Sequence, residues 1–310
     1  MSQSSLEIGT EPGAVALAGD ISVASAGDYF ALLKPRVMSL VVFTGFVGLY
    51  LAPGNLHPIL GAVAVLCIAV AAGASGAINM WFERDIDAVM VRTRSRPIPA
   101  GRIEPANALG FGVVLAVGAI SLMGLALNWV AAALLALSVA FYVFVYTIWL
   151  KRRTPQNIVI GGAAGAFPPM IGWAAATGEV SLASVALFAI IFMWTPPHFW
   201  SLALYRSEDY ARAGVPMLPV VAGRRETRRQ ILIYTVLLLP ITLAPYMLGV
   251  SGLIYLSAAL ILGALFFGFV LRVWSNPGEP SARAAFRFSI LYLFLLFVGL
   301  IADRAVVGLV

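Results

Sequence analysis

Long apolar stretches recur along the sequence and leave few folds open to it. A membrane-spanning helix needs about 20 mostly apolar residues. We place about nine such stretches, near residues 37–53, 58–81, 107–126, 129–149, 157–176, 181–204, 231–249, 252–272 and 286–306. Only 11% of the 310 residues are charged, too few to cover the surface of a soluble fold of this length. The sequence predicts an all-α integral membrane protein.

Basic residues are confined almost entirely to alternate connections between these stretches. If there are nine spans, all of the 20 Lys and Arg residues except Arg304 lie on one side of the membrane. They fall within residues 34–36, 84–102, 151–153, 206–229 and 272–287. Because basic loops stay in the cytosol, we expect a cytosolic N-terminus and an external C-terminus. The long polar loops then suggest a helical bundle around a central cavity that opens toward the cytosolic face.

Residues 1–28 differ from the remainder of the chain. They are acidic, rich in Ser, Ala and Gly, and contain no Lys or Arg. Neither a secretory signal nor a mitochondrial presequence has this composition. We therefore expect a disordered tail over residues 1–28, a polytopic membrane domain over residues 29–310, and a location in the bacterial inner (plasma) membrane.

A row of oxygen-bearing side chains follows the second span. Asn79, Glu83 and Asp87 are spaced by four residues, so on a continuing helix they share one face, whereas Asp85 points elsewhere. Such groups are costly at a membrane surface unless something positive satisfies them, and Mg²⁺ prefers oxygen ligands completed by substrate phosphates. The row predicts a Mg²⁺ site. The alternative is a loop whose charges only set orientation, but acidic residues contribute little to topology.

Three arginines come soon after this row. Arg92, Arg94 and Arg96 could each bind phosphate oxygens through paired hydrogen bonds. For Arg94 and Arg102, membrane topology alone is an equally good explanation.

A second polar region starts at the sequence Pro196-Pro197-His198-Phe199-Trp200, and Tyr205 and Asp209 follow it four residues apart. Proline frees backbone groups, which is tolerated in a membrane only where protein or water satisfies them. We expect a break here with His198 facing the bundle interior, and a similar break lining a cavity at Pro168-Pro169. His198 is either a hydrogen-bonded packing residue or an imidazole ligand or proton carrier.

Together these motifs resemble those of the UbiA superfamily of intramembrane prenyltransferases, and most closely the branch that acts on heme. The similarity spans roughly residues 30–305. It rests on residues 79–93, 157–162, 168–173, 196–200, 209–210 and 216–221. It departs from the wider superfamily at Glu83, where Asp is more usual, and at Tyr205, which stands in an acidic position. The second departure leaves open whether a second metal ion is held as tightly.

The resemblance implies that the protein transfers a farnesyl group from farnesyl diphosphate to a vinyl group of heme b, with addition of water, to give heme O. It implies Mg²⁺ as the cofactor, held by Asn79, Glu83, Asp87 and Asp209. The same four residues are expected to act in catalysis together with Arg92, Lys151, Tyr205 and His198. Substrate binding is expected from Arg84, Arg96, Arg152, Arg206 and His198.

Two other functions fit parts of the pattern. A related prenyltransferase acting on an aromatic quinone precursor would use the same diphosphate site, but it gives no reason for residues 196–200. A transporter or channel could also have nine spans, although transporters usually carry ionisable groups near the bilayer midplane. The expected partners are farnesyl diphosphate, heme b and the lipid bilayer, with heme-handling or terminal-oxidase assembly proteins as further candidates and no nucleic acid.

Overall fold

The computed structural model describes residues 24–307, and within that range the chain forms helices and no strand. The helices are α1 Ala26–Leu32, α2 Pro35–Leu51, α3 Pro58–Phe82, α4 Arg84–Val89, α5 Pro105–Ala126, α6 Trp129–Ala140, the π-helix η1 Phe141–Leu150, α7 Asn157–Thr177, α8 Leu182–Tyr205, α9 Ser207–Arg212, α10 Leu218–Val221, α11 Gly223–Ile241, α12 Ala244–Met247, α13 Leu253–Ser275 and α14 Glu279–Val307.

The number of membrane spans agrees with the sequence. Among the described residues, 8 helical segments are long and apolar enough to cross a membrane. Two of them combine consecutive helices, α6 with η1 and α11 with α12. Helices α1 and α2, bent by 56° where they meet, are long and apolar enough only when taken together, and they then count as a ninth candidate span. The prediction of an all-helical membrane protein with about nine spans is confirmed.

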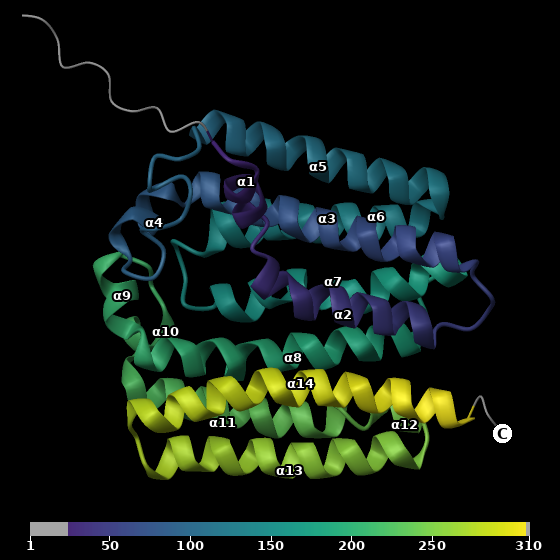
Figure 1. The fold of residues 1–310 in the computed structure, drawn as a ribbon. Coiled ribbons are helices and arrows are strands. Elements are labelled where there is room, and N and C mark those ends of the chain that lie inside the picture. Colours follow the sequence, from purple (N-terminus) through teal and green to yellow (C-terminus); the bar gives the residue numbers. More distant parts are fainter. Residues whose placement is uncertain (1–23, 308–310) are drawn as a thin grey trace, which may run out of the picture.

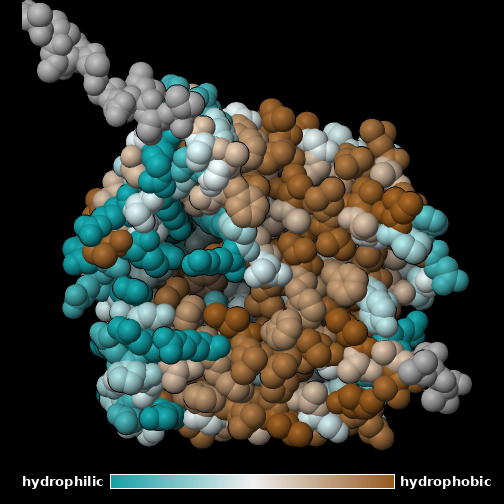
Figure 2. Space-filling model, in the orientation of Figure 1, coloured by the Kyte–Doolittle hydropathy of each residue, from teal (hydrophilic) through white to brown (hydrophobic). Residues whose placement is uncertain are grey.

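The long helices lie side by side, and the short helices α4, α9 and α10 lie at one end of the bundle (Figure 1). We call this end, formed by the connections 83–104, 151–156, 206–217 and 276–278, the charged end. Hydrophilic residues gather there, while a hydrophobic belt covers the middle of the molecule (Figure 2). The same view shows the surface hollowed between hydrophilic side chains beside the charged end. The hydrophilic residues of the charged end therefore lie at the border of the apolar belt.

The paired prolines do not break their helices, so the predicted breaks are wrong. Pro168 and Pro169 lie inside α7 and are buried. Proline removes the backbone donor to the carbonyl four residues earlier, and for Pro168 that is Ala164. The Ser138 hydroxyl donates to the Ala164 oxygen at 3.0 Å, which satisfies the freed carbonyl.

These prolines also take part in close packing and do not line a cavity as predicted. A Cβ added to Gly48 of α2 would lie 2.0 Å from the Pro169 oxygen, and one added to Gly172 would lie 2.0 Å from the Gly45 oxygen. Helices α2 and α7 thus touch backbone to backbone, which only small residues permit. Pro196 and Pro197 are likewise buried within α8, which continues to Tyr205.

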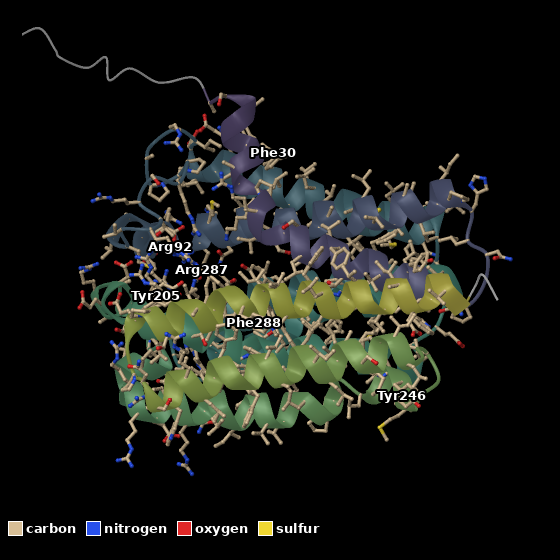
Figure 3. All side chains as sticks on the ribbon, turned by 60° about the horizontal axis from the view of Figure 1, so that its bottom comes forward. Phe30, Arg92, Tyr205, Tyr246, Arg287 and Phe288 are labelled. Carbon is tan, nitrogen blue, oxygen red and sulfur yellow. The ribbon has the colours of Figure 1, made fainter. Side chains whose placement is uncertain are left out.

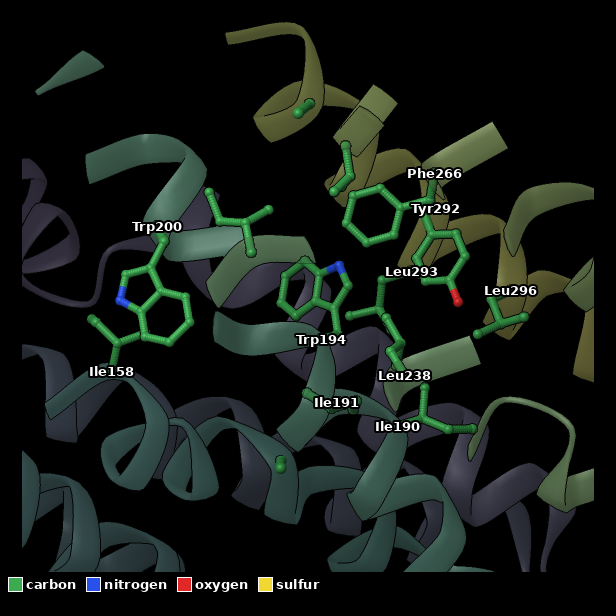
Figure 4. Close-up of a cluster of buried hydrophobic side chains, with 14 of the residues drawn as sticks. Ile158, Ile190, Ile191, Trp194, Trp200, Leu238, Phe266, Tyr292, Leu293 and Leu296 are labelled. Carbon is green, nitrogen blue, oxygen red and sulfur yellow. The ribbon is translucent and has the colours of Figure 1, made fainter. Parts of the chain in front are cut away.

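The largest apolar core lies among α8, α11, α13 and α14. Figure 4 shows Trp194 and Trp200 of α8 in this core, with Phe266 and Tyr292 contributed by α13 and α14. Trp200, Phe266 and Tyr292 are at most 1% exposed. Aromatic side chains of this size remove much apolar area from lipid and water, so this core fixes α8 against the last helices.

A buried carboxylate near the end of α14 caps another helix. Asp303 is 2% exposed. It accepts hydrogen bonds from the backbone N–H of Gly252, and of Ile254 and Tyr255 at 3.1 and 3.3 Å. The first N–H groups of a helix have no partner within it, and Asp303 provides one for α13.

Helix α1 begins before residue 28, the predicted end of the tail. Ser25 and Asp28 form a reciprocal capping box that starts α1 at Ala26. Asp28 also pairs with Arg102 at 2.7 Å, which ties α1 to the connection after α4. Residues 1–23 of the predicted tail lie outside the described residues.

Candidate functional site

The predicted row on one helix face is present in the structure. Helix α3 ends at Phe82, but the backbone N–H of Glu83 donates to Asn79 at 2.9 Å, and that of Asp87 donates to Glu83 at 2.8 Å. This bonding continues the helical path into α4, so Asn79, Glu83 and Asp87 stay in line. Each is only 2% exposed. By contrast, the Asp85 side chain is 61% exposed, as its position on another face requires.

The amide of Asn79 is held from both sides. Lys34 donates from Nζ to Asn79 Oδ1 at 2.7 Å, and the Asn79 amide nitrogen donates to Thr147 Oγ1 at 3.1 Å. Thr147 is fully buried. These two bonds fix which way the amide points, so that its oxygen faces the basic group.

Both buried carboxylates of the row have a basic partner. Lys151 Nζ lies 2.5 Å from Glu83 Oε2. Arg96 donates from one guanidinium nitrogen to both carboxylate oxygens of Asp87, at 2.8 and 2.6 Å. Carboxylates this deeply buried require such compensation, since an unpaired buried charge is strongly destabilising.

Two irregular backbone segments bring the cations to the row. Lys34 stands at the bend between α1 and α2 with a φ of 51°, a left-handed conformation that is uncommon for residues other than glycine. Thr147 and Lys151 come from the end of η1, where the Lys151 N–H donates to the carbonyl of Tyr146, five residues back, at 2.9 Å. Such π-helical turns are frequent at functional sites.

The row fits a hard divalent cation. Glu83 Oε1 is buried and has no hydrogen-bond partner within the described residues. The amide and carboxylate oxygens of Asn79, Glu83 and Asp87 are the donor atoms that Mg²⁺ prefers. Lys34, Lys151 and Arg96 lie beside these oxygens, so basic side chains are in place next to any anionic group that enters.

Asp209 does not join these residues in one ligand set. In residues 24–307, no three His, Cys, Asp or Glu side chains are grouped so that they could hold a metal ion. Asp209 is 5% exposed and is paired with Arg212, and more distantly with Arg206 at 3.9 Å, both close to it in sequence. Asn79, Glu83 and Asp87 thus lie in one row, and Asp209 lies in a separate motif.

Tyr205 stands among arginines at the end of α8. The guanidinium groups of Arg206 and Arg283 lie 5.7 and 5.1 Å from its ring centre. Figure 3 places Tyr205, Arg92 and Arg287 at the charged end of the bundle, and Tyr246 at the opposite end. The second motif is therefore a basic surface, suited to binding phosphate or carboxylate groups.

Two of the predicted substrate-binding arginines are engaged elsewhere. Arg152 donates to both oxygens of Asp85 at 2.8 and 2.7 Å. This hydrogen bonding holds the pKa of the Asp85 carboxyl below its usual value and raises that of the Arg152 guanidinium. Arg84 donates to the Trp81 carbonyl at 2.8 Å and lies over that indole ring. Both arginines thus support the outer side of α4, and neither is hydrogen-bonded to Asn79, Glu83 or Asp87.

His198 is partly buried and enclosed by aromatic rings. Trp194 stacks on it with a centroid distance of 4.2 Å, Phe286 stacks at 4.7 Å, and Phe199 meets it edge-on at 5.2 Å. Its Nδ1 lies 2.7 Å from the Ser289 hydroxyl. His198 is therefore held between α8 and α14, as a packed and hydrogen-bonded side chain.

Comparison with known proteins identifies the family. Residues 41–298 match the model of the UbiA prenyltransferase family. The chain belongs to this family. Among curated UbiA-type relatives, the Protoheme IX farnesyltransferases of Granulibacter bethesdensis and Parvibaculum lavamentivorans are each 60% identical to it. The first alignment covers 92% of both chains, and the second covers 90% of this chain and 89% of the relative. The resemblance inferred from the motifs is confirmed, and the protein is a prenyltransferase.

Solved structures of the family have the same fold. An apo UbiA homologue from Aeropyrum pernix K1 matches with a TM-score of 0.71 at 20% identity, over 87% of this chain and 98% of that one. A UbiA homologue from Archaeoglobus fulgidus bound to DMAPP and Mg²⁺ matches with a TM-score of 0.63 at 16% identity, over 87% and 99%. The UbiA fold is thus shared over nearly the whole of each chain.

Sequence reasoning did not identify three residues of this UbiA site. Lys34 was counted only as a topology signal, yet it binds the Asn79 amide. Thr147 and Ser289 had no signal in the sequence, because their partners lie 68 and 91 residues away. For Lys34 the available signal was a charged residue directly before a proline-initiated span.

Proposed function

We propose that this UbiA prenyltransferase moves a farnesyl group from farnesyl diphosphate to a vinyl group of heme b, with addition of water, to give heme O. The observation that carries the proposal is the buried row Asn79–Glu83–Asp87 with its three basic partners, in a chain 60% identical to proteins named Protoheme IX farnesyltransferase. The row supports the diphosphate chemistry, and the relatives support heme b as the acceptor.

The first step breaks the bond between the farnesyl C1 and the diphosphate oxygen, and the electron pair leaves with the diphosphate. Asn79, Glu83 and Asp87 would hold Mg²⁺, which supplies positive charge next to the phosphate oxygens. Lys151 and Arg96, which pair with Glu83 and Asp87 in this structure, would then be free to donate to the leaving group. Basic donors next to the phosphate oxygens lower the barrier because they stabilise the charge that develops on the leaving group.

The allylic cation must be kept from water, which would otherwise give farnesol. Tyr142 and Tyr146 of η1 lie near the row, with ring centres 5.4 Å apart, and Lys151 Nζ lies 5.8 Å from the Tyr146 ring centre. Aromatic faces stabilise cations, and apolar walls exclude water from reactive intermediates. We assign both tasks to this part of the site.

In the second step the terminal vinyl carbon of heme uses its π electrons to bond to the farnesyl C1. The positive charge then rests on the carbon attached to the porphyrin, which delocalises it. Water adds to that carbon and loses a proton. His198 is assigned either to the heme iron or to that proton, and its position about two turns before the end of α8 at Tyr205 supports contact with the acceptor.

Purified protein incubated with heme b, farnesyl diphosphate and Mg²⁺ tests the proposal, with the porphyrin product identified by mass. We expect a farnesyl-plus-water adduct that EDTA and Asp87→Ala both abolish. Asp85→Ala is the matched control, since that carboxylate faces outward. Prenylation of a phenolic acid in place of heme b would retain the diphosphate site and overturn the acceptor.

We further propose that the protein lies in the bacterial inner membrane with the charged end in the cytosol. The support is the position of the basic residues, which this topology places on the cytosolic side. Reporter fusions test it: alkaline phosphatase joined after residue 310 should be active, and the same enzyme joined at residue 155 should be inactive. The reverse pattern would invert the orientation.

A further inference from the structure

The side chains around His198 fix the position of its imidazole ring. Its two ring faces are covered by Trp194 and Phe286, at interplanar angles of 17° and 25°. The Trp194 indole N–H donates to the backbone carbonyl of Ser289 at 2.8 Å. The imidazole can therefore neither turn over nor slide, and it meets other molecules only at its ring edge.

One hydrogen bond determines where the imidazole proton sits. The Ser289 hydroxyl lies 2.7 Å from the carbonyl of Phe286 and 2.7 Å from His198 Nδ1. A hydroxyl has a single hydrogen, and a carbonyl only accepts. The Ser289 hydrogen is therefore donated to Phe286, so the Ser289 oxygen accepts from the N–H at His198 Nδ1.

This arrangement leaves the other nitrogen with a free lone pair. A neutral imidazole carries one proton, and here Nδ1 holds it. His198 Nε2 makes no hydrogen bond to any residue between 24 and 307. It can accept a proton or bind a Lewis acid, but it cannot donate a hydrogen bond to a departing diphosphate.

We infer that Ser289 is a positioning residue that fixes His198 as the Nδ1–H tautomer and presents the Nε2 lone pair to the iron of the acceptor. Histidines that bind metals usually donate their second ring N–H to a fixed acceptor, which orients the ring and makes it more basic. Ser289 is fully buried, so water does not compete for this bond. The choice of iron as the ligand rests on the proposed function, whereas the tautomer does not.

Nitrogen-15 NMR of histidine-labelled protein tests the tautomer directly, without any substrate. The chain has only two histidines, and His57 can be replaced by Asn, which also caps helix starts, because His57 caps α3. We expect a single histidine whose Nε2 is unprotonated. In Ser289→Ala the signals should move toward the Nε2–H form, which water favours for free imidazole. An Nε2–H histidine in the parent protein would overturn the inference.

A heme titration followed in the visible spectrum tests the consequence. Ser289→Ala should weaken ferric heme b binding about tenfold or more, the usual effect of losing such a supporting bond, and should change the axial-ligand bands. Ser201→Ala is the matched control, since this buried serine donates to the Pro197 carbonyl of the same helix at 2.7 Å. Equal heme affinity in both variants would contradict iron ligation.

The two experiments can fail separately. If the expected tautomer is found but heme b is neither bound nor prenylated, the role of Ser289 stands and the proposed acceptor is wrong. If heme b is prenylated while His198 carries its proton on Nε2, the proposed function stands and the inference about Ser289 is wrong.

Discussion

Two acidic motifs at the charged end are held in different ways. Glu83 and Asp87 are paired with Lys151 and Arg96, of which Lys151 lies 68 residues away and has a side chain only 16% exposed. Asp209 is paired with arginines three residues away on either side, whose side chains are 42% and 53% exposed. The Lys151–Glu83 pair is thus assembled by the tertiary fold, whereas Arg96 is 9 residues from Asp87 and the arginines of Asp209 are its close neighbours in sequence.

This contrast separates a preformed site from an adaptable one. Buried pairs built from distant elements lose their geometry only if the bundle moves, whereas exposed local pairs are weak and easily exchanged. The row at α3 and α4 therefore holds its geometry without a bound ligand. The arginines around Asp209 can leave their partner and follow a substrate as it enters.

The largest effect is expected from the buried row. Asp87→Asn keeps the shape of the side chain but removes a charged metal ligand and the partner of Arg96, so turnover should fall about a hundredfold or more. Product formation at saturating substrates measures this loss. Asp85→Asn, on the exposed face, should retain most activity. Equal losses in the two variants would show that burial does not distinguish these carboxylates.

The next effect concerns stability. Lys151→Met leaves Glu83 buried without its partner, which should lower the free energy of unfolding by about 3–5 kcal/mol. Thermal unfolding in detergent measures it as a lower Tm. Adding Glu83→Gln should restore much of the stability but not the activity, because the unpaired charge is gone while the metal ligand is lost. No recovery in the double variant would argue against a buried charge pair.

The second motif should respond differently to the same kind of change. Arg212→Gln removes a half-exposed partner of the buried Asp209 carboxylate, but Arg206 remains beside it, so stability should fall by about 1 kcal/mol, less than in Lys151→Met. The KM for farnesyl diphosphate should rise by a few-fold, because a mobile basic group at the mouth of the site is lost. Arg229→Gln, another exposed arginine paired three residues away, serves as the control. A stability loss as large as that of Lys151→Met would remove the contrast between the motifs.

The smallest effect tests whether the stability that an ion pair contributes depends on its exposure or on the motif to which it belongs. The Arg152 hydrogen bonds lower the pKa of Asp85 below its ordinary 3.8. The lowered pKa means that the pair stabilises the folded state above the ordinary value, and that this contribution disappears as the pH falls through the folded-state pKa. Arg152→Gln should therefore lower the free energy of unfolding at neutral pH by well under 1 kcal/mol, since the pair is exposed. Thermal unfolding should show this as a slightly lower Tm. A constant difference down to strongly acidic pH would rule out ionisation of Asp85 as its cause.

Some features were predictable because they depend on local periodicity. The spans follow from runs of apolar residues, and the shared face of Asn79, Glu83 and Asp87 follows from four-residue spacing, which the structure keeps across the α3–α4 junction. The family resemblance was carried by the same local motifs, and residues 41–298 bear it out.

Other features were not predictable because they depend on contacts between distant helices. The prolines of α7 and α8 suggested breaks, but Ser138 of a neighbouring helix satisfies the carbonyl that Pro168 frees. The two partners of the Asn79 amide, Lys34 and Thr147, could not be assigned either. Lys34 depends on a left-handed bend, and Thr147 depends on the wider turn of a π-helix. Neither signal is present in hydropathy or charge spacing.

The cap that Asp303 places on α13 has a consequence for how the chain is made. The N–H groups of Gly252, Ile254 and Tyr255 are synthesised about 50 residues before the carboxylate that satisfies them. During translation, therefore, α13 enters the bilayer with its first turn uncapped, and the arrival of α14 completes it. A chain that ends shortly before Asp303 should therefore keep α13 with an uncapped first turn.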